Sequence, residues 1–129
     1  MNINYSFERP LAPQDVQRLL KQTNWADERD IPGIETMMEN SFLTIGAWDD
    51  DRLIGFARVL SDGVYRALID DVVVDELYRG KGIGTEIIKH LLSRLGQVEE
   101  IFLRTEKEMV SFYERLGFTL SRGTTMDWE

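Results

Sequence analysis

The segment RGKGIG, residues 79–84, places three glycines on alternate positions, with one cation before them and one between them. Glycine has no side chain, so the backbone N–H groups of this segment stay uncovered. The segment joins an apolar run to a helical pattern, and uncovered N–H groups at the start of a helix bind anions. The spacing therefore predicts a pyrophosphate site formed by the whole segment: Arg79, Gly80, Lys81, Gly82, Ile83 and Gly84.

Three other interpretations of these glycines compete with the anion site. A dinucleotide-binding turn needs a third glycine where the chain has Thr85, and no second strand-helix-strand half follows. A Walker A loop needs serine or threonine where the chain has Gly82. A plain turn from strand to helix needs only one glycine. The pyrophosphate site is the interpretation that uses all three.

The same segment resembles the acetyl-CoA loop of the GCN5-related N-acetyltransferases, the GNAT superfamily, whose pattern is Arg/Gln-x-x-Gly-x-Gly/Ala directly after a strand. One strand and one helix later, FYERLGF at residues 112–118 resembles the late Phe-Tyr-x-x-x-Gly-Phe signature of that family. The flanking segments are similar to a plant and cyanobacterial branch, whose members are described as serotonin-type arylalkylamine or lysine N-acetyltransferases.

The resemblance implies direct transfer of an acetyl group from acetyl-CoA to a primary amine, with no metal ion. It also implies that Val72, Val73 and Val74 form a strand whose exposed backbone pairs with the pantetheine arm of CoA. The N–H group of Val73 or Val74 would then polarise the thioester carbonyl.

The resemblance implies a second role, for Tyr113, as the acid that protonates the departing CoA thiolate. Many members of the family have an asparagine seven residues before this tyrosine that contacts CoA. This chain has Glu106 there, so Arg104 or Thr105 is expected to take over the contact, or the contact is absent.

A general base is needed because an alkylammonium acceptor, with a pKa of about 10, must lose a proton before it attacks. The candidates are Asp70 and Asp71 at the start of the cofactor strand, Asp62 in the preceding turn, and Glu35, directly or through a water molecule. Adjacent residues of a strand face opposite ways, so only one of Asp70 and Asp71 is expected to face the cleft. The one histidine, His90, falls on the solvent side of its helix.

The resemblance implies an acceptor pocket built from the early helices, the turns around the hairpin and the loop near the last strands. Apolar and acidic residues gather in those stretches: Trp25, Phe42, Trp48, Met37 and Met38, with Asp27, Glu28, Asp30 and Glu35. Aromatic walls with carboxylates suit an amine on an aromatic body, but also a lysine side chain, a protein N-terminus, a polyamine or an amino sugar. The alternative function is an acetyl-CoA-binding sensor without turnover, and an intact Tyr113 favours an enzyme.

Hydrophobic periodicity predicts the elements that position these residues. Strands are expected at 3–8, on both sides of the acidic turn within 41–63, at 64–74, at 99–105 and finally within 118–128, and helices at 13–22, 34–41, 83–95 and 107–117. The order β-α-α-β-β-β-α-β-α-β predicts a single domain over residues 1–129. Its class is mixed α/β, with a twisted, mostly antiparallel mixed sheet flanked by helices, as in the GNAT fold.

Composition narrows the remaining choices. The net charge of −8 argues against a nucleic-acid partner, and the absence of cysteine excludes disulfides and thiolate metal sites. The chain starts without a signal-peptide pattern, and no apolar run reaches the length of about 20 residues that spans a membrane. These features predict a cytoplasmic protein with no membrane partner. The C-terminal TTMDW segment makes a homodimer an option, by strand pairing across a two-fold axis.

Overall fold

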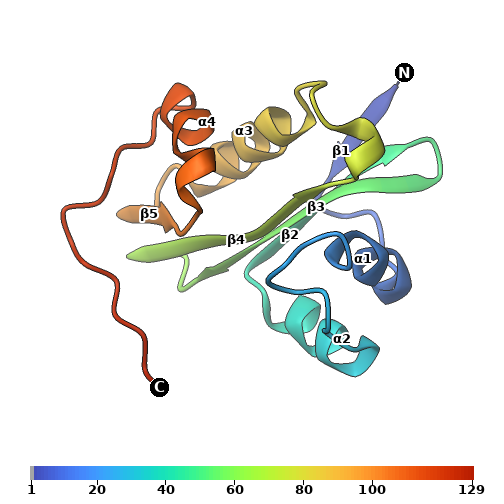
Figure 1. Ribbon diagram of the computed structural model, residues 1–129, viewed down its shortest axis with the longest axis horizontal. Coiled ribbons are helices and arrows are strands. Elements are labelled where there is room, and N and C mark those ends of the chain that lie inside the picture. Colours follow the sequence, from blue (N-terminus) through green and yellow to red (C-terminus); the bar gives the residue numbers. More distant parts are fainter. Residues whose placement is uncertain (1) are drawn as a thin grey trace.

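The computed structural model describes residues 2–129, which form a five-stranded sheet with helices on both of its faces (Figure 1). The elements, in chain order, are β1 Ile3–Ser6, α1 Pro13–Leu20, α2 Ile31–Asn40, β2 Leu43–Asp49, β3 Arg52–Ser61, β4 Arg66–Val74, the 3₁₀ turn η1 Glu76–Tyr78, α3 Ile83–Leu95, β5 Glu100–Leu103, the 3₁₀ turn η2 Lys107–Met109 and α4 Val110–Arg115.

The strands lie side by side in the order in which they occur along the chain. Neighbours from β1 to β4 are antiparallel, whereas β5 runs parallel to β4 because α3 carries the chain back across the sheet. Helices α1 and α2 cover one face of the sheet, and α3 and α4 cover the other (Figure 1). The predicted mixed α/β class is confirmed.

Two separate apolar clusters hold these layers together, one on each face of the sheet. Helix α3 turns its apolar stripe onto the first face, where Ile87, Ile88 and Leu91 are fully buried against β2, β3 and β4. Helix α1 packs Val16 and Leu19 on the second face, against alternate side chains of the same strands. Burying side chains of this size stabilises the fold by about 1.5–3 kcal/mol each.

The N-termini of α1 and α2 are each stabilised by a local residue. Pro13 occupies the first turn of α1, where the N–H group it lacks would have no partner. The Asp30 carboxylate accepts the Gly33 N–H at 2.9 Å and so caps α2. Within residues 2–129, no helix has the length and apolar character required to cross a membrane.

The C-terminal segment differs from the predicted pattern, because residues 116–129 form neither a strand nor a helix. Instead this segment runs away from the body of the fold, and Leu120, Met126 and Trp128 are 75%, 89% and 99% exposed (Figure 1). An ion pair of 3.3 Å between Arg104 and Asp127 joins it to the chain after β5. Alternation over a few residues does not specify a strand without a partner, and β5 offers an edge of only four residues.

Candidate active site

Strand β4 is longer than its neighbour β5, which leaves part of its edge without a partner. Strand β5 pairs only with the stretch from Arg66 to Ile69, so residues 70–74 extend beyond it. The Asp75 N–H donates to the Ile54 carbonyl of β3 at 2.8 Å. Because pairing directions alternate along an antiparallel strand, the N–H groups of Val74 and Val72 point away from β3, into the open edge.

A β-bulge interrupts β4 where this open edge begins. Phe56 of β3 pairs with Val73 and Arg58 pairs with Asp70, so Ala57 alone lies opposite two residues of β4. Asp71 adopts the left-handed conformation with φ of 53°, which is uncommon for a residue other than glycine. The extra residue breaks the alternation of side chains along the strand.

The bulge places the carboxylates of Asp70 and Asp71 on the same face of the sheet. Arg58 bonds both of them, with Nε 2.6 Å from Asp71 Oδ2 and Nη2 3.1 Å from Asp70 Oδ2. The expectation that the two aspartates face opposite ways is therefore wrong, because the alternation rule assumes a regular strand.

Asp71 is fully buried and each of its oxygens has a donor. Arg29 Nη1 lies 2.7 Å from Oδ2, and Trp25 Nε1 lies 3.0 Å from Oδ1. Burial raises the pKa of Asp71, but the hydrogen bonds and charges of Arg29 and Arg58 outweigh burial and hold the pKa below its usual value. Asp71 therefore stays ionised and fixes two arginines. Asp70 is more accessible, with 39% of its side chain exposed.

The two other predicted bases lie apart from the open edge. Asp62 Oδ1 accepts the N–H groups of Val64 and Tyr65 at 2.8 and 2.7 Å, and these hydrogen bonds lower its pKa. It closes the turn at the far end of β4. Glu35 is exposed on α2, and His90 stacks on the Tyr5 ring with centroids 4.9 Å apart.

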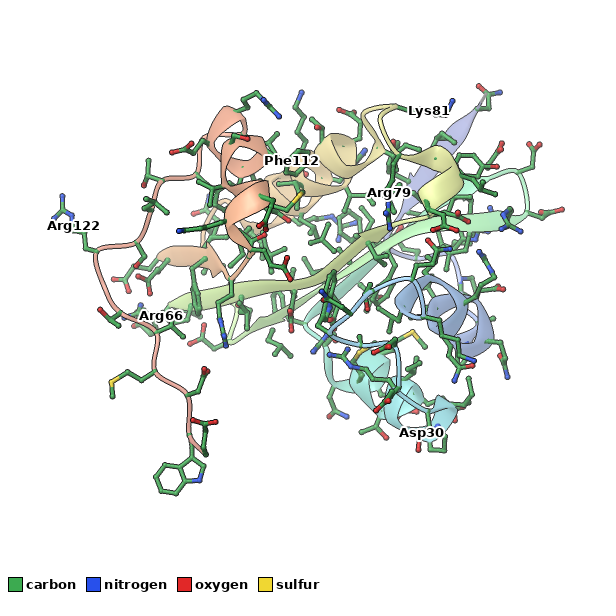
Figure 2. All side chains as sticks on the ribbon, viewed as in Figure 1. Asp30, Arg66, Arg79, Lys81, Phe112 and Arg122 are labelled. Carbon is green, nitrogen blue, oxygen red and sulfur yellow. The ribbon has the colours of Figure 1, made fainter. Side chains whose placement is uncertain are left out.

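The glycine loop leads from the end of β4 to the start of α3 (Figure 2). Gly80 and Gly82 have φ of 78° and 82°, and a Cβ atom at either position would meet nothing within 4 Å. Conformation therefore requires glycine at both positions, and the space above them is open. The Arg79 Nε donates to the Val74 carbonyl at 3.1 Å, which ties the loop to the strand.

Helix α3 begins with uncovered N–H groups, as the glycine spacing predicts. Its first backbone bond runs from the Glu86 N–H to the Gly82 carbonyl at 3.1 Å, and no side chain caps the helix. The N–H groups of Ile83, Gly84 and Thr85 therefore lack an intrahelical partner. A Cβ atom on Gly84 would lie 3.8 Å from Val74 Cγ2, so these N–H groups start beside the open edge of β4.

Tyr113 lies on α4, in the same apolar cluster as Val72 and Val74. Its ring meets those of Phe112 and Phe118 edge to face, with centroids 4.9 and 5.7 Å apart. No hydrogen bond joins its hydroxyl to another group of residues 2–129, and the oxygen is not sealed from solvent. Burial of the ring raises the pKa of the Tyr113 phenol, so the hydroxyl keeps its proton at neutral pH.

The segment between β5 and α4 is exposed, and Thr105 lies within it. Its neighbours are already engaged: Arg104 pairs with Asp127, and the Glu106 carboxylate accepts Asn24 Nδ2 at 3.5 Å. Residues 2–129 contain no group of three or more histidine, aspartate or glutamate side chains that could hold a metal ion.

Sequence reasoning missed Arg29 and Arg58, which bind the aspartates of the bulge. Arg58 could have been noticed, because it is a charged residue on the inward face of the otherwise apolar strand LIGFARVL. Nothing in the loop around Arg29 distinguishes it from a solvated surface charge.

Comparison with known proteins places this geometry in a family. A sequence model of the Acetyltransferase (GNAT) family matches residues 6–118. An uncharacterized N-acetyltransferase, ycf52-like, of Prochlorococcus marinus is 34% identical over an alignment of 122 residues that covers 90% of this chain and 67% of that protein. A chloroplastic serotonin N-acetyltransferase 2 of Oryza sativa is 39% identical over 71 residues, 54% of this chain and 36% of that protein.

The fold also matches a solved structure along its whole length. A GNAT family acetyltransferase from Streptococcus pneumoniae superposes with a TM-score of 0.87 and 25% identity, covering 99% of this chain and 98% of that one. The family match spans the open edge of β4 and both segments that indicated the resemblance, residues 79–84 and 112–118. The chain therefore belongs to the acetyltransferase (GNAT) family and is an acyltransferase.

Proposed function

We propose that this protein transfers an acetyl group from acetyl-CoA directly to a primary amine. One observation carries the proposal: the unpaired edge of β4 at Val72 and Val74 adjoins the uncovered N-terminus of α3. The first feature suits a chain of amides that needs backbone partners, and the second suits a pyrophosphate. CoA carries both groups, in that order.

The bound cofactor would follow these two features. The pantetheine amides pair with the backbone of Val72 and Val74, and the pyrophosphate binds at residues 79–84, where Arg79 and Lys81 add positive charge. The N–H group of Val73 is expected to face β3, because the Asp75 N–H two residues on donates to β3 and the direction alternates along the strand. This favours Val72 or Val74 as the donor to the thioester carbonyl. Thr105 is the proposed replacement for the asparagine of other members.

The chemistry balances with groups of this chain. The acceptor ammonium loses one proton through water, the neutral nitrogen attacks the thioester carbon, the C–N bond forms and the C–S bond breaks. The CoA sulfur takes the proton of the Tyr113 hydroxyl, which has no competing partner. The second proton that the nitrogen loses on forming the amide restores the Tyr113 hydroxyl. Of the two adjacent carboxylates, Asp70 is the better base, reached through water. Asp71 is less suited to accept a proton, because two arginines hold its pKa low.

The cofactor site is tested by titrating the protein calorimetrically with acetyl-CoA, using Gly82→Ala as the variant. A side chain in the left-handed conformation covers the helix N-terminus, so we expect Kd to rise by about tenfold. Gly117→Ala is the matched control, because Gly117 also has a positive φ, 104°, with nothing within 4 Å of its Cβ position. Equal losses in both variants would contradict a role for the loop.

Turnover is tested by release of free thiol from acetyl-CoA in the presence of a panel of primary amines. Acetyl-CoA binding without thiol release on any amine would favour the alternative, a sensor without turnover. A cytoplasmic location remains a prediction, since the relatives of the chain include chloroplastic proteins.

We also propose that the protein is a homodimer, paired through the exposed C-terminal segment. Met126 and Trp128 leave large apolar surfaces in water, and the outer edge of β5 has no strand beside it. Light scattering after size exclusion should give twice the mass of the chain, and the chain mass for the Met126→Ser, Trp128→Ser double variant. Leu77→Ser, at a residue 74% exposed on η1, is the control and should stay dimeric. A monomeric parent protein would contradict the proposal.

A further inference from the structure

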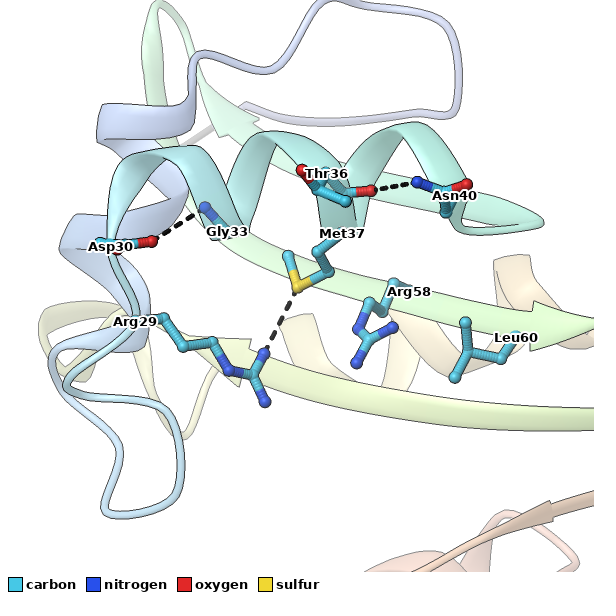
Figure 3. A pocket seen from close by; sticks show the side chains of 8 residues that line it. All are labelled: Arg29, Asp30, Gly33, Thr36, Met37, Asn40, Arg58 and Leu60. Atoms are coloured by element: carbon cyan, nitrogen blue, oxygen red, sulfur yellow. Dashed lines mark hydrogen bonds between the residues drawn. The ribbon is translucent and has the colours of Figure 1, made fainter.

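A hollow of about 480 Å³ opens between α2 and β3, next to the bulge of β4 (Figure 3). The hollow lies on the α2 face of the sheet, whereas the start of α3, where the pyrophosphate is proposed to bind, lies on the opposite face. A cofactor whose pyrophosphate binds at α3 leaves this face for the acceptor. The hollow is lined by Arg29, Asp30, Gly33, Thr36, Met37, Asn40, Arg58 and Leu60.

Two guanidinium groups enter this hollow with hydrogen-bond donors to spare. Arg29 uses Nη1 for Asp71 and for the Met37 sulfur at 3.4 Å, and Arg58 uses Nε and Nη2 for the two aspartates. Within residues 2–129, Nε and Nη2 of Arg29 and Nη1 of Arg58 donate to no acceptor. Figure 3 shows both groups beneath α2, on the same side of the hollow.

Within residues 2–129, none of the nearby carboxylates of Asp30, Asp70 and Asp71 accepts a hydrogen bond from those three donors. Both oxygens of Asp71 are already bonded, and Asp70 Oδ1 accepts the Asp71 N–H at 2.9 Å. The Asp30 carboxylate caps α2 through the Gly33 N–H. Asp71 instead holds both arginines in place from the buried side, so their free N–H groups are fixed before any ligand arrives.

A pair of fixed guanidinium groups at a hollow recognises two-oxygen anions such as carboxylate and phosphate. Arg58 also lies 3.1 Å from the half-exposed carboxylate of Asp70, which attracts an ammonium group. We propose that this hollow binds the anionic group of the acceptor, so the acceptor is an amine that also carries a carboxylate or a phosphate. The inference rests on the proposed acetyl transfer and names the substrate class for it.

The test is calorimetric titration of the CoA-saturated protein with matched pairs of amines. L-lysine is compared with cadaverine and L-tryptophan with tryptamine, which differ by one carboxylate; O-phosphoethanolamine is compared with ethanolamine. We expect the anionic member of at least one pair to bind about tenfold more tightly, as charge-assisted hydrogen bonds to guanidinium predict. The pair whose two members differ in affinity shows whether the hollow binds a carboxylate or a phosphate.

Variants assign the preference to the hollow. Arg29→Gln should abolish it and Arg29→Lys should restore part of it. Arg66→Gln, at an exposed arginine that begins β4, should leave it intact. Thr36→Trp fills the hollow and leaves the ion pairs of Asp71 in place, so it should weaken binding of the anionic amine of each pair. This variant replaces the Arg29 variants if those do not fold.

Each outcome decides the matter. Equal affinity within every pair, tighter binding of the neutral members, or no binding of either member would overturn the anion site while acetyl-CoA binding and thiol release remain intact. Loss of the preference in Arg66→Gln as well would also overturn it. If the protein does not bind acetyl-CoA, the proposed function itself fails, and this inference with it.

Discussion

Replacing Tyr113 with phenylalanine is expected to lower kcat for acetyl transfer by about 100- to 1,000-fold, in the range of general acid catalysis. The variant keeps the ring that packs against Phe112 and Phe118 and removes only the hydroxyl. Without that proton, the thiolate must leave as an anion in a partly apolar site. Because the hydroxyl has no partner among residues 2–129, its removal leaves no donor or acceptor of that range unsatisfied.

Steady-state thiol release and calorimetric Kd for acetyl-CoA separate the two effects of this substitution. We expect the Kd to change less than twofold, since in the proposed reaction the hydroxyl acts on the leaving group and not on the bound pyrophosphate. Tyr65→Phe is the matched control, at a tyrosine 60% exposed between β3 and β4, and should keep the parent kcat. An unchanged kcat in Tyr113→Phe would assign protonation of the thiolate to water.

Replacing Asp71 with alanine is expected to lower the free energy of unfolding by about 3 kcal/mol, the lower end of the range for breaking a buried ion pair. Arg58 and Arg29 would lose their shared acceptor, and Trp25 Nε1 its only one. The lower end applies because both arginine side chains keep part of their contact with solvent. Urea unfolding followed by circular dichroism measures the change.

Three further variants divide this effect into its causes. Asp71→Gly relieves the positive φ and should be about 1 kcal/mol more stable than Asp71→Ala, since alanine adopts this conformation poorly. Asp71→Asn retains a residue that tolerates it and removes only the charge. Asp70→Ala, at the half-exposed neighbour, should change stability by less than about 1 kcal/mol. If Asp71→Ala matched Asp70→Ala, the buried ion pairs would contribute nothing to the fold.

The pH dependence has a definite sign. The pKa of Asp71 is lowered in the folded state, so its ionised form stabilises the fold above the unfolded pKa of about 4. That contribution is lost as the pH falls below this value. The difference in stability between the parent protein and Asp71→Asn should therefore narrow on acidification.

The elements around the site follow from patterns that are local in sequence. The stripe Ile83, Ile87, Leu91 and Leu95 predicts α3, and the loop 79–84 predicts its uncovered start, because both depend on residues within a few positions of each other. The placement of Tyr113 near Val72 and Val74 follows from the family resemblance rather than from periodicity.

The bulge at Asp71 could not be predicted in this way. A regular strand would turn Asp70 and Asp71 to opposite faces. The segment of β4, RALIDDVVV, contains no glycine that would indicate an irregularity. The left-handed residue is stabilised by Arg29, which is 42 positions away in the chain. The direction of the Val72 and Val74 N–H groups depends on the same register between β3 and β4. It therefore could not be predicted from the sequence either. The prediction of a strand in the C-terminal segment was wrong for the opposite reason. The local alternation is present in the sequence, but the segment pairs with no other strand of residues 2–129.

The two separate apolar clusters described above divide the molecule into halves that can change independently. Substitutions among the buried residues of α1 and α2 need no compensation from α3, because the sheet lies between them. On the proposed function, the layer of α1 and α2 can therefore change with the acceptor while the layer of α3 is kept, and a laboratory library can be confined to one layer. The exception is Asp71, because its side chain bonds Arg29 on the α2 side and its bulge sets the register of Val72 and Val74, which pack on the α3 side.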